Sequence, residues 1–222
     1  TEPVKVPYTP DVEARYTETV TRKFVDLSAR IEEARKNGNY GLAEKLVRNQ
    51  GMSPSWHLYP FAGGYMNDIN GFFYYNGYYH VFNQFTESIN GNGPYGWMHS
   101  VTKDFVDFEY LGTAIKPDQH YNANGVWSGN AFFDKDGKPC VVYYANGVGI
   151  CLARPKDLSD PKLTEWVNDE ANPVLPIPTG EANYKVYDVS NVWIDNGVYY
   201  MLSGNKTVDT DKPTTYLYKS LN

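Results

Sequence analysis

Four Asn-Gly or Asp-Gly dipeptides divide most of this chain into short segments of β-strand character. They begin at Asn76, Asp136, Asn146 and Asn196, and each lies between runs rich in Tyr, Phe, Val and Ile. Such dipeptides favour the positive φ angles of tight hairpin turns, and aromatic and β-branched residues favour strands. The chain from about residue 56 onward is therefore predicted to consist of antiparallel hairpins.

The predicted strands fall into three sets, each about 50–60 residues long. The first set comprises Gly71–Tyr75, Tyr78–Gln84, Trp97–Thr102 and Phe108–Leu111; the second comprises Val126–Phe133, Cys140–Tyr144, Gly149–Ala153 and a segment near Trp166; the third comprises Tyr187–Ile194, Val198–Ser203 and Thr215–Tyr218. Units of this kind at this period are typical of propeller blades. The fold class is therefore predicted as all-β, with about three blades of a β-propeller. Because three blades do not close a ring, the remaining blades are expected on a second polypeptide or fragment.

Residues 1–50 form a predicted helical extension that differs from the rest of the chain. An apolar residue recurs every three or four positions along one helix face. These residues are Val12, Tyr16, Val20, Phe24, Leu27 and Ile31. Asn37 and Gly38 then predict the end of this helix, and a shorter helix is predicted from about Tyr40 to Asn49. We interpret the pair as an amphipathic hairpin packed on the second predicted domain, residues 51–222, with a partner-binding or dimerising helix as the alternative.

Charge and composition narrow the class of function. With 20 basic and 26 acidic residues, the net charge is −6, which argues against nucleic acid as the main partner. No apolar run approaches the length of a membrane span. Aromatic residues make up 16% of the chain, which suits strands and also suits a pocket that stacks sugar rings.

The two cysteines, Cys140 and Cys151, are too few for a disulfide scaffold or a zinc site. If Asn146-Gly147 forms a two-residue hairpin turn, residues 142 and 151 face each other and the cysteines lie diagonally on one face. We interpret both as buried small hydrophobic residues, with a disulfide as the alternative. No His/Cys/Asp cluster has metal-ligand spacing and no glycine-rich loop cradles phosphate, so the sequence predicts neither metal nor cofactor.

The segment 65–71 reads Tyr-Met-Asn-Asp-Ile-Asn-Gly and is the candidate for carrying chemistry. A turn here would hold the carboxylate of Asp68 at the mouth of a strand, with neighbouring amides to orient it. Glycoside hydrolysis needs two carboxyl groups across the scissile bond. The alternative is that Asp68 is only a turn residue whose side chain caps the local backbone.

This segment and the hairpin after it resemble the opening of glycoside hydrolase family 32, the invertase and fructan-hydrolase family. That family begins its first blade with Trp-Met-Asn-Asp-Pro-Asn-Gly. Three further segments, 97–106, 127–130 and 187–189, resemble its later motifs in the same order. The resemblance covers about residues 56–222 and implies a five-bladed β-propeller of which this chain is the N-terminal part.

The resemblance also implies catalytic roles for two aspartates. Asp68 would be the nucleophile that attacks the anomeric carbon of a terminal fructosyl unit, with net retention of configuration. Asp188 would stabilise the oxocarbenium-like transition state through hydrogen bonds to sugar hydroxyls. For Asp188, the alternative is a residue that caps a bend.

Further residues are implied in substrate binding. They are Asn67 and Gln84 on the sugar hydroxyls, Trp97 as a pocket wall, Trp127 and Ser128 against the fructosyl ring, and Tyr187 beside Asp188. For the two tryptophans the alternative is an ordinary core aromatic, and for Gln84 it is a strand-end residue. His99 is interpreted as a buried, hydrogen-bonded structural histidine.

The chain departs from the family pattern at several places, and its loop 90–93 lacks a Trp that the family often has there. Tyr65 replaces a Trp, Ile69 replaces a Pro, and Tyr187 replaces an Arg. The last replacement exchanges a charged guanidinium with several donors for a single hydroxyl. The family's acid/base Glu has no match before Asn222, so the general acid is expected outside these residues.

The predicted function is therefore a retaining glycoside hydrolase that cleaves terminal β-fructofuranosyl units from sucrose or fructans. One alternative is a non-catalytic carbohydrate-binding propeller fragment, and another is a related five-bladed glycosidase acting on a different sugar. The family's usual location implies an extracellular or cell-envelope protein.

Overall fold

The computed structural model describes residues 10–49, 54 and 57–222. Its contacts divide into two compact units, one within residues 1–53 and 61–63 and one within residues 54–60 and 64–222. Each unit has its own internal packing.

The first unit contains two α-helices, α1 (Pro10–Lys36) and α2 (Tyr40–Arg48), and the short 3₁₀ turn η1 (Phe61–Gly63). The break between the helices is where the sequence predicts it. Gly38 adopts a φ of 69°, a left-handed conformation suited to glycine after a helix, and the Asn39 side chain accepts a hydrogen bond from the backbone N–H of Leu42. The predicted hairpin of helices is therefore confirmed.

The apolar face of this hairpin is buried in part where its side chains are described, since Leu27 is half-buried. Ile31 on α1 and Val47 on α2 are buried, and both approach Gly63, where an added Cβ would lie 2.9 Å from each side chain. The side chains of Val12, Tyr16, Val20 and Phe24 lie outside the described residues. Among the described residues, neither helix carries an apolar run that could cross a bilayer.

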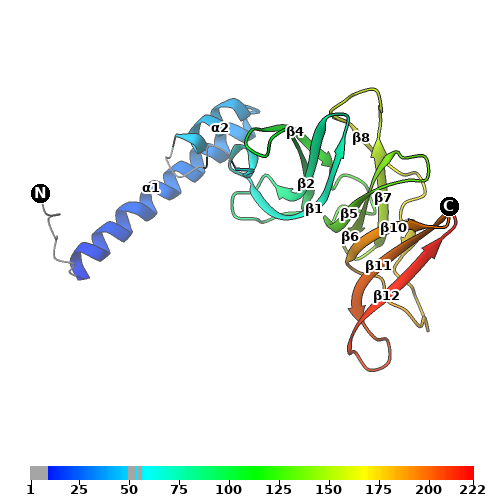
Figure 1. The fold of residues 1–222 in the computed structure, drawn as a ribbon. Helices are drawn as coiled ribbons and strands as arrows, with labels where there is room; N and C mark the ends of the chain where they lie inside the picture. The colour runs from blue at the N-terminus through cyan, green and yellow to red at the C-terminus, as the bar shows by residue number, and fades with distance from the viewer. Residues whose placement is uncertain (1–9, 50–53, 55–56) are drawn as a thin grey trace, which may run out of the picture. The chain divides into compact units, whose positions relative to one another are not determined.

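The second unit consists of three antiparallel sheets that follow one another along the chain (Figure 1). The first sheet contains β1 (Tyr65–Tyr75), β2 (Tyr78–Thr86), β3 (Gly96–Thr102) and β4 (Phe108–Ile115). The second contains β5 (Val126–Phe133), β6 (Pro139–Ala145), β7 (Gly149–Pro155), β8 (Trp166–Asn168) and β9 (Leu175–Pro176). The third contains β10 (Val189–Asp195), β11 (Val198–Lys206) and β12 (Pro213–Ser220). The predicted grouping into three blades is confirmed.

The strands differ from the prediction in their ends and by one additional strand. β1 begins at Tyr65 rather than Gly71, so the segment 65–71 is part of a strand and not a turn before one. β10 begins at Val189 rather than Tyr187. The two-residue strand β9, which pairs with β7, was not predicted.

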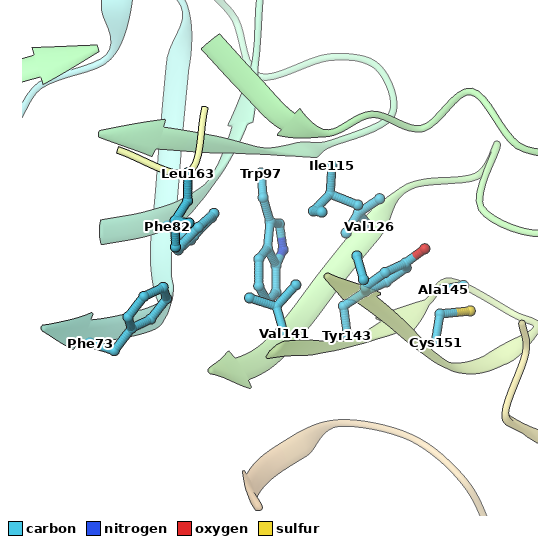
Figure 2. Close-up of a cluster of buried hydrophobic side chains, with 11 residues drawn as sticks. Phe73, Phe82, Trp97, Ile115, Val126, Val141, Tyr143, Ala145, Cys151 and Leu163 are labelled. Atoms are coloured by element: carbon cyan, nitrogen blue, oxygen red, sulfur yellow. The ribbon is translucent and has the colours of Figure 1, made fainter. Parts of the chain in front are cut away.

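The core lies between successive sheets, and the second sheet is buried on both faces. On β6, Val141 and Tyr143 pack with Phe82 and Trp97 of the first sheet, as Figure 2 shows. Val142 and Tyr144, which alternate with them along β6, belong to a separate cluster that faces the third sheet. Because strand side chains alternate between faces, every residue of β6 is buried.

Cys140 and Cys151 are both buried and free, as the interpretation as small hydrophobic residues predicts. The predicted register of their strands is wrong by one residue, because Cys151 faces Tyr143 rather than Val142. Ala145 pairs with Gly149, so the hairpin loop contains three residues instead of two.

Candidate active site

The first strand of each sheet carries β-bulges where the candidate residues lie. In β1, Asn67 and Asp68 lie opposite the single residue Gln84 of β2. A second irregularity places Asn70 where β2 has no residue opposite it. Bulges interrupt the alternation of a strand and re-aim its side chains. They therefore explain how one strand can hold the polar residues Asn67, Asp68 and Asn70 within four positions.

The second and third sheets repeat this feature. In β5, Trp127 and Ser128 lie opposite the single residue Tyr144. In β10, Ser190 is the inserted residue and follows Asp188 by two positions. Since β5 contacts both β1 and β10, the bulged first strands of the three sheets lie side by side. The fold thus gathers candidate residues that are far apart in sequence.

Hydrogen bonds connect three of the candidate binding residues across two sheets. The Asn67 side-chain amide donates to Gln84 Oε1 at 3.2 Å. The Gln84 amide in turn donates to Ser128 Oγ at 3.5 Å. Gln84 is buried while Asn67 is exposed, so the chain of polar groups runs from the interior to the surface. Such a row of donors and acceptors can bind the hydroxyls of a polyol.

The two aspartates occupy different environments. The side chain of Asp68 is exposed, and that of Asp188 is partly buried. Within the described part of the chain, neither forms a salt bridge. Asp68 is therefore available to a ligand and is not held in a structural ion pair.

An aromatic cluster lies next to Asp188. The ring of Tyr187 is edge-on to Trp127, with centroids 6.4 Å apart, and tilted against Tyr144 at 5.1 Å. Tyr187 is still 40% exposed. Partial burial, followed by the negative charge of Asp188 and the proximity of Tyr144, raises the pKa of Tyr187. Its hydroxyl therefore stays protonated at neutral pH and can donate a hydrogen bond.

Trp97 does not occupy the position expected of a pocket wall. Its side chain is 0% exposed and lies inside the core between the first two sheets (Figure 2). A ring without exposed surface cannot stack on a sugar. Its indole N–H instead donates to the Trp127 carbonyl at 2.9 Å, and an added Cβ at Gly129 would lie 2.8 Å from its ring. Trp97 therefore supports the bulged strand β5 from behind.

His99 is a structural histidine, as predicted. It is fully buried, and its Nε2 lies 3.0 Å from Nδ1 of His80, which is also fully buried. Burial lowers the pKa of His80 to about 4, against the opposing effects of the Tyr75 carbonyl and the charge of Asp160. Burial and the neighbouring His80 hold the pKa of His99 well below its usual value. Both rings are therefore neutral at neutral pH.

Three further residues contribute to the site, of which the sequence indicated Asn70 only as a neighbouring amide and did not single out Asn130 or Tyr144. Asn70 and Asn130 connect neighbouring first strands, because Asn70 accepts from the Gly129 N–H and Asn130 donates to the Ser190 carbonyl. Tyr144 completes the aromatic cluster. Asn70 and Asn130 stand inside matched motifs, but only the paired strands show what they contact. No three His, Cys, Asp or Glu side chains in the described residues are grouped so that they could hold a metal ion.

Neighbouring strands therefore carry an exposed carboxylate, a hydrogen-bonded row of polar groups and an aromatic cluster. Such groups suit a neutral, hydroxyl-rich ring. Polar groups from β1, β2 and β5 would contact hydroxyls, and aromatic rings would cover an apolar ring face. This combination is typical of carbohydrate sites.

Comparison with curated proteins finds relatives of two kinds, a fructofuranosidase and a fructosyltransferase. The vacuolar acid beta-fructofuranosidase 1 of Rosa hybrid cultivar is 37% identical over 161 residues, which cover 70% of this chain and 27% of that protein. The sucrose:sucrose 1-fructosyltransferase of Festuca arundinacea is 36% identical over 162 residues, covering 70% of this chain and 25% of that protein. The chain thus spans about a quarter of the length of these curated relatives.

Solved structures share both fold and sequence. Fructan 1-exohydrolase IIa of Cichorium intybus matches with a TM-score of 0.67 and 31% identity, covering 78% of this chain and 33% of that one. A structure of the same enzyme in complex with 1-kestose matches with a TM-score of 0.66. The all-β propeller architecture inferred from the motifs is thereby confirmed.

The family model of the glycosyl hydrolases family 32 N-terminal domain matches residues 57–222, a range that includes all three sheets. Because this match covers most of the chain and agrees with the curated relatives and the structural neighbours, the chain belongs to glycosyl hydrolases family 32.

Proposed function

We propose that this chain supplies the nucleophile and part of the substrate-binding surface of a retaining glycoside hydrolase. The substrate would be a terminal β-fructofuranosyl unit of sucrose or a fructan. The observation that carries this proposal is the exposed Asp68 in a bulged strand, beside the hydrogen-bonded row of Asn67, Gln84 and Ser128. Relatives that are named as fructofuranosidases and fructan hydrolases support the choice of sugar.

In the proposed first step, a carboxylate oxygen of Asp68 forms a bond to the anomeric carbon of the fructosyl unit. The bond from that carbon to the leaving oxygen breaks, and a general acid protonates the leaving oxygen. Water then attacks the fructosyl-enzyme ester, the same group takes the water's proton, and Asp68 is released. Two inversions leave the configuration unchanged.

Asp188 and the residues around it would act on the transition state. Positive charge develops on the sugar ring as the leaving group departs, so a carboxylate that hydrogen-bonds ring hydroxyls binds more tightly at that stage. Tyr187 and Trp127 would pack beside the ring, and the Tyr187 hydroxyl would donate a hydrogen bond. Trp97 would act by holding β5 rather than by touching substrate.

The complete enzyme would contain further blades and the acid/base glutamate, carried by a second polypeptide or fragment. The chain spans about a quarter of its curated relatives, which supports a larger catalytic unit. Exposed aromatic residues support it too. Phe72 and Tyr74 of β1 are half exposed on the face opposite the buried Phe73, and Trp193 of β10 is also exposed. If this chain purified as a stable monomer that cleaves fructosides unaided, the second polypeptide would be excluded.

We further propose that residues 1–50 are an extension separate from the blades in residues 51–222. For the complete protein we propose an extracellular or cell-envelope location, outside the cytosol. One curated relative is named as a vacuolar enzyme, which also operates outside the cytosol.

The substitution Asp68→Asn tests the proposal. It removes the attacking charge while keeping the shape, so cleavage of sucrose and inulin by the complete enzyme should fall by at least about a thousandfold. The matched control is Asp136→Asn, at an exposed aspartate in a remote hairpin, which should retain activity.

Each other outcome assigns a different function. Undiminished cleavage by Asp68→Asn would exclude Asp68 as the nucleophile. If the unmodified enzyme binds fructosides by calorimetry but cleaves none, the protein is a carbohydrate-binding module. Cleavage of an arabinoside and of no fructoside would assign a different sugar.

A further inference from the structure

We propose that Asn70 is a positioning residue that holds the backbone of Asp68 in the geometry needed for attack. This inference rests on the proposed role of Asp68 and names a residue that acts on it without touching substrate. The side chain of Asn70 is only 7% exposed, whereas that of Asp68 is exposed. Asn70 therefore lies behind the strand surface on which Asp68 is presented.

Both ends of the Asn70 carboxamide are used. Its Nδ2 donates to the backbone carbonyl of Asp68 at 2.8 Å. Its Oδ1 accepts from the backbone N–H of Gly129 at 3.0 Å. One side chain thus joins the segment that carries the proposed nucleophile to the first strand of the neighbouring sheet. Only a side chain with a donor and an acceptor at this reach can make both contacts.

The bulges make this connection necessary. Asn67 and Asp68 share one opposing residue on β2, and Asn70 has none, so regular pairing does not fix the strand here. The carboxamide of Asn70 replaces the missing ladder contact. Without it, the carbonyl of Asp68 would lose a buried donor, and the carboxylate would take up a wider range of positions.

The anchor at Gly129 is rigid. An added Cβ at Gly129 would lie 2.0 Å from the Val142 carbonyl oxygen and 2.8 Å from the Trp97 ring, so the strand is pressed against its neighbours there. Trp97 also donates to the Trp127 carbonyl in the same strand. Through its two hydrogen bonds, Asn70 therefore fixes the backbone of Asp68 relative to a tightly packed strand.

The test compares Asn70→Ala with Asn122→Ala in the complete enzyme. Asn122 is a matched control, because it too is buried, accepts from the Gln119 N–H and donates to the Lys116 carbonyl, but lies in a loop outside the site. Both substitutions should lower the melting temperature. Only Asn70→Ala should lower kcat, by roughly 10- to 100-fold, with KM changed by less than about threefold.

Asn70→Asp keeps the test decisive if Asn70→Ala does not fold. The aspartate retains the shape and the acceptor for Gly129 but, when ionised, cannot donate to the Asp68 carbonyl. We expect a similar loss in kcat. The new negative charge beside the nucleophile should also move the acidic limb of the kcat/KM profile to higher pH.

The failure of this inference differs from the failure of the proposed function. If Asp68→Asn is inactive while Asn70→Ala and Asn70→Asp keep the unmodified kcat and pH profile, Asn70 does not position Asp68. An equal loss of kcat in Asn122→Ala would also overturn the inference, since the effect would then follow stability alone. If Asp68→Asn remains active, the proposed function itself is wrong.

Discussion

Acid should destabilise the first sheet through its buried histidine pair. His80 on β2 and His99 on β3 are fully buried, and their facing nitrogens are 3.0 Å apart. The Nδ1 of His99 has no hydrogen-bond partner. Protonation of either ring would place a charge among the stacked rings of Phe73 and Phe82. The Tyr75 carbonyl beside His80 and the charge of Asp160 would stabilise that charge, but burial outweighs them. The folded state therefore resists protonation.

The pKa of His80 gives the magnitude. It is about 4 in the folded protein and 6.5 for an unperturbed histidine. Between these values the unfolded chain binds more protons, so the free energy of unfolding decreases as pH falls. The neutral His80 contributes about 3 kcal/mol to the free energy of unfolding above about pH 6.5, and most of this contribution is lost by about pH 4.5. His99, whose pKa is also lowered, adds a change of the same sign.

Urea unfolding followed by tryptophan fluorescence measures this effect between about pH 7.5 and pH 4.5. Trp166 is a natural reporter, because its ring is edge-on to His99 at 6.2 Å. Between these pH values, the free energy of unfolding should fall by at least about 2 kcal/mol less in the double variant His80→Gln/His99→Gln than in the unmodified protein. Both proteins have the same carboxylates, so the contributions of the carboxylates cancel in this comparison. His120→Gln, at an exposed histidine, controls for the loss of a histidine. Parallel pH profiles for the double variant and the unmodified protein would refute the reasoning.

Two further substitutions test the packing and the recognition at the site. Gly129→Ala should destabilise the protein by about 3 kcal/mol, or roughly 6–12 °C in Tm, because the new methyl group would overlap the Val142 carbonyl. The control is Gly204→Ala, where an added Cβ meets nothing within 4 Å. Equal melting temperatures for the two variants would contradict the prediction. Tyr187→Phe keeps the aromatic contacts but removes the hydroxyl. The KM for sucrose should therefore rise about five- to tenfold in initial-rate measurements. An unchanged KM would show that the Tyr187 hydroxyl does not bind substrate.

The hairpins were predictable because their turns depend on local backbone preference. Asn76 and Gly77 adopt φ angles of 50° and 83°, and Asn196 and Gly197 adopt 48° and 76°, as two-residue turns with positive φ require. The turn at Asn146-Gly147 looks the same in sequence but includes Val148 as well. Its longer loop changes the register, which depends on how the strands pack and not on the dipeptide alone.

The candidate site was predictable in residue identity more than in geometry. The motif identified Asp68, but the bulges hid the strand, because extra residues break the alternation that marks one. The burial of Trp97 results from packing against the second sheet, which no local pattern reports. The contact between Asn70 and Gly129 joins residues 59 positions apart, so it emerges only when the sheets are assembled.

The bulged starts of β1, β5 and β10 also decide where the chain can change length. Deleting one residue at an inserted position such as Asn70 or Ser190 would close the bulge into regular pairing, and the bend that aims the neighbouring candidate side chains would be lost. Deletions there should therefore be eliminated by selection. The exposed loop between β11 and β12 has no such constraint, and it is where variation in length among natural sequences, or the insertion of a tag, should be tolerated.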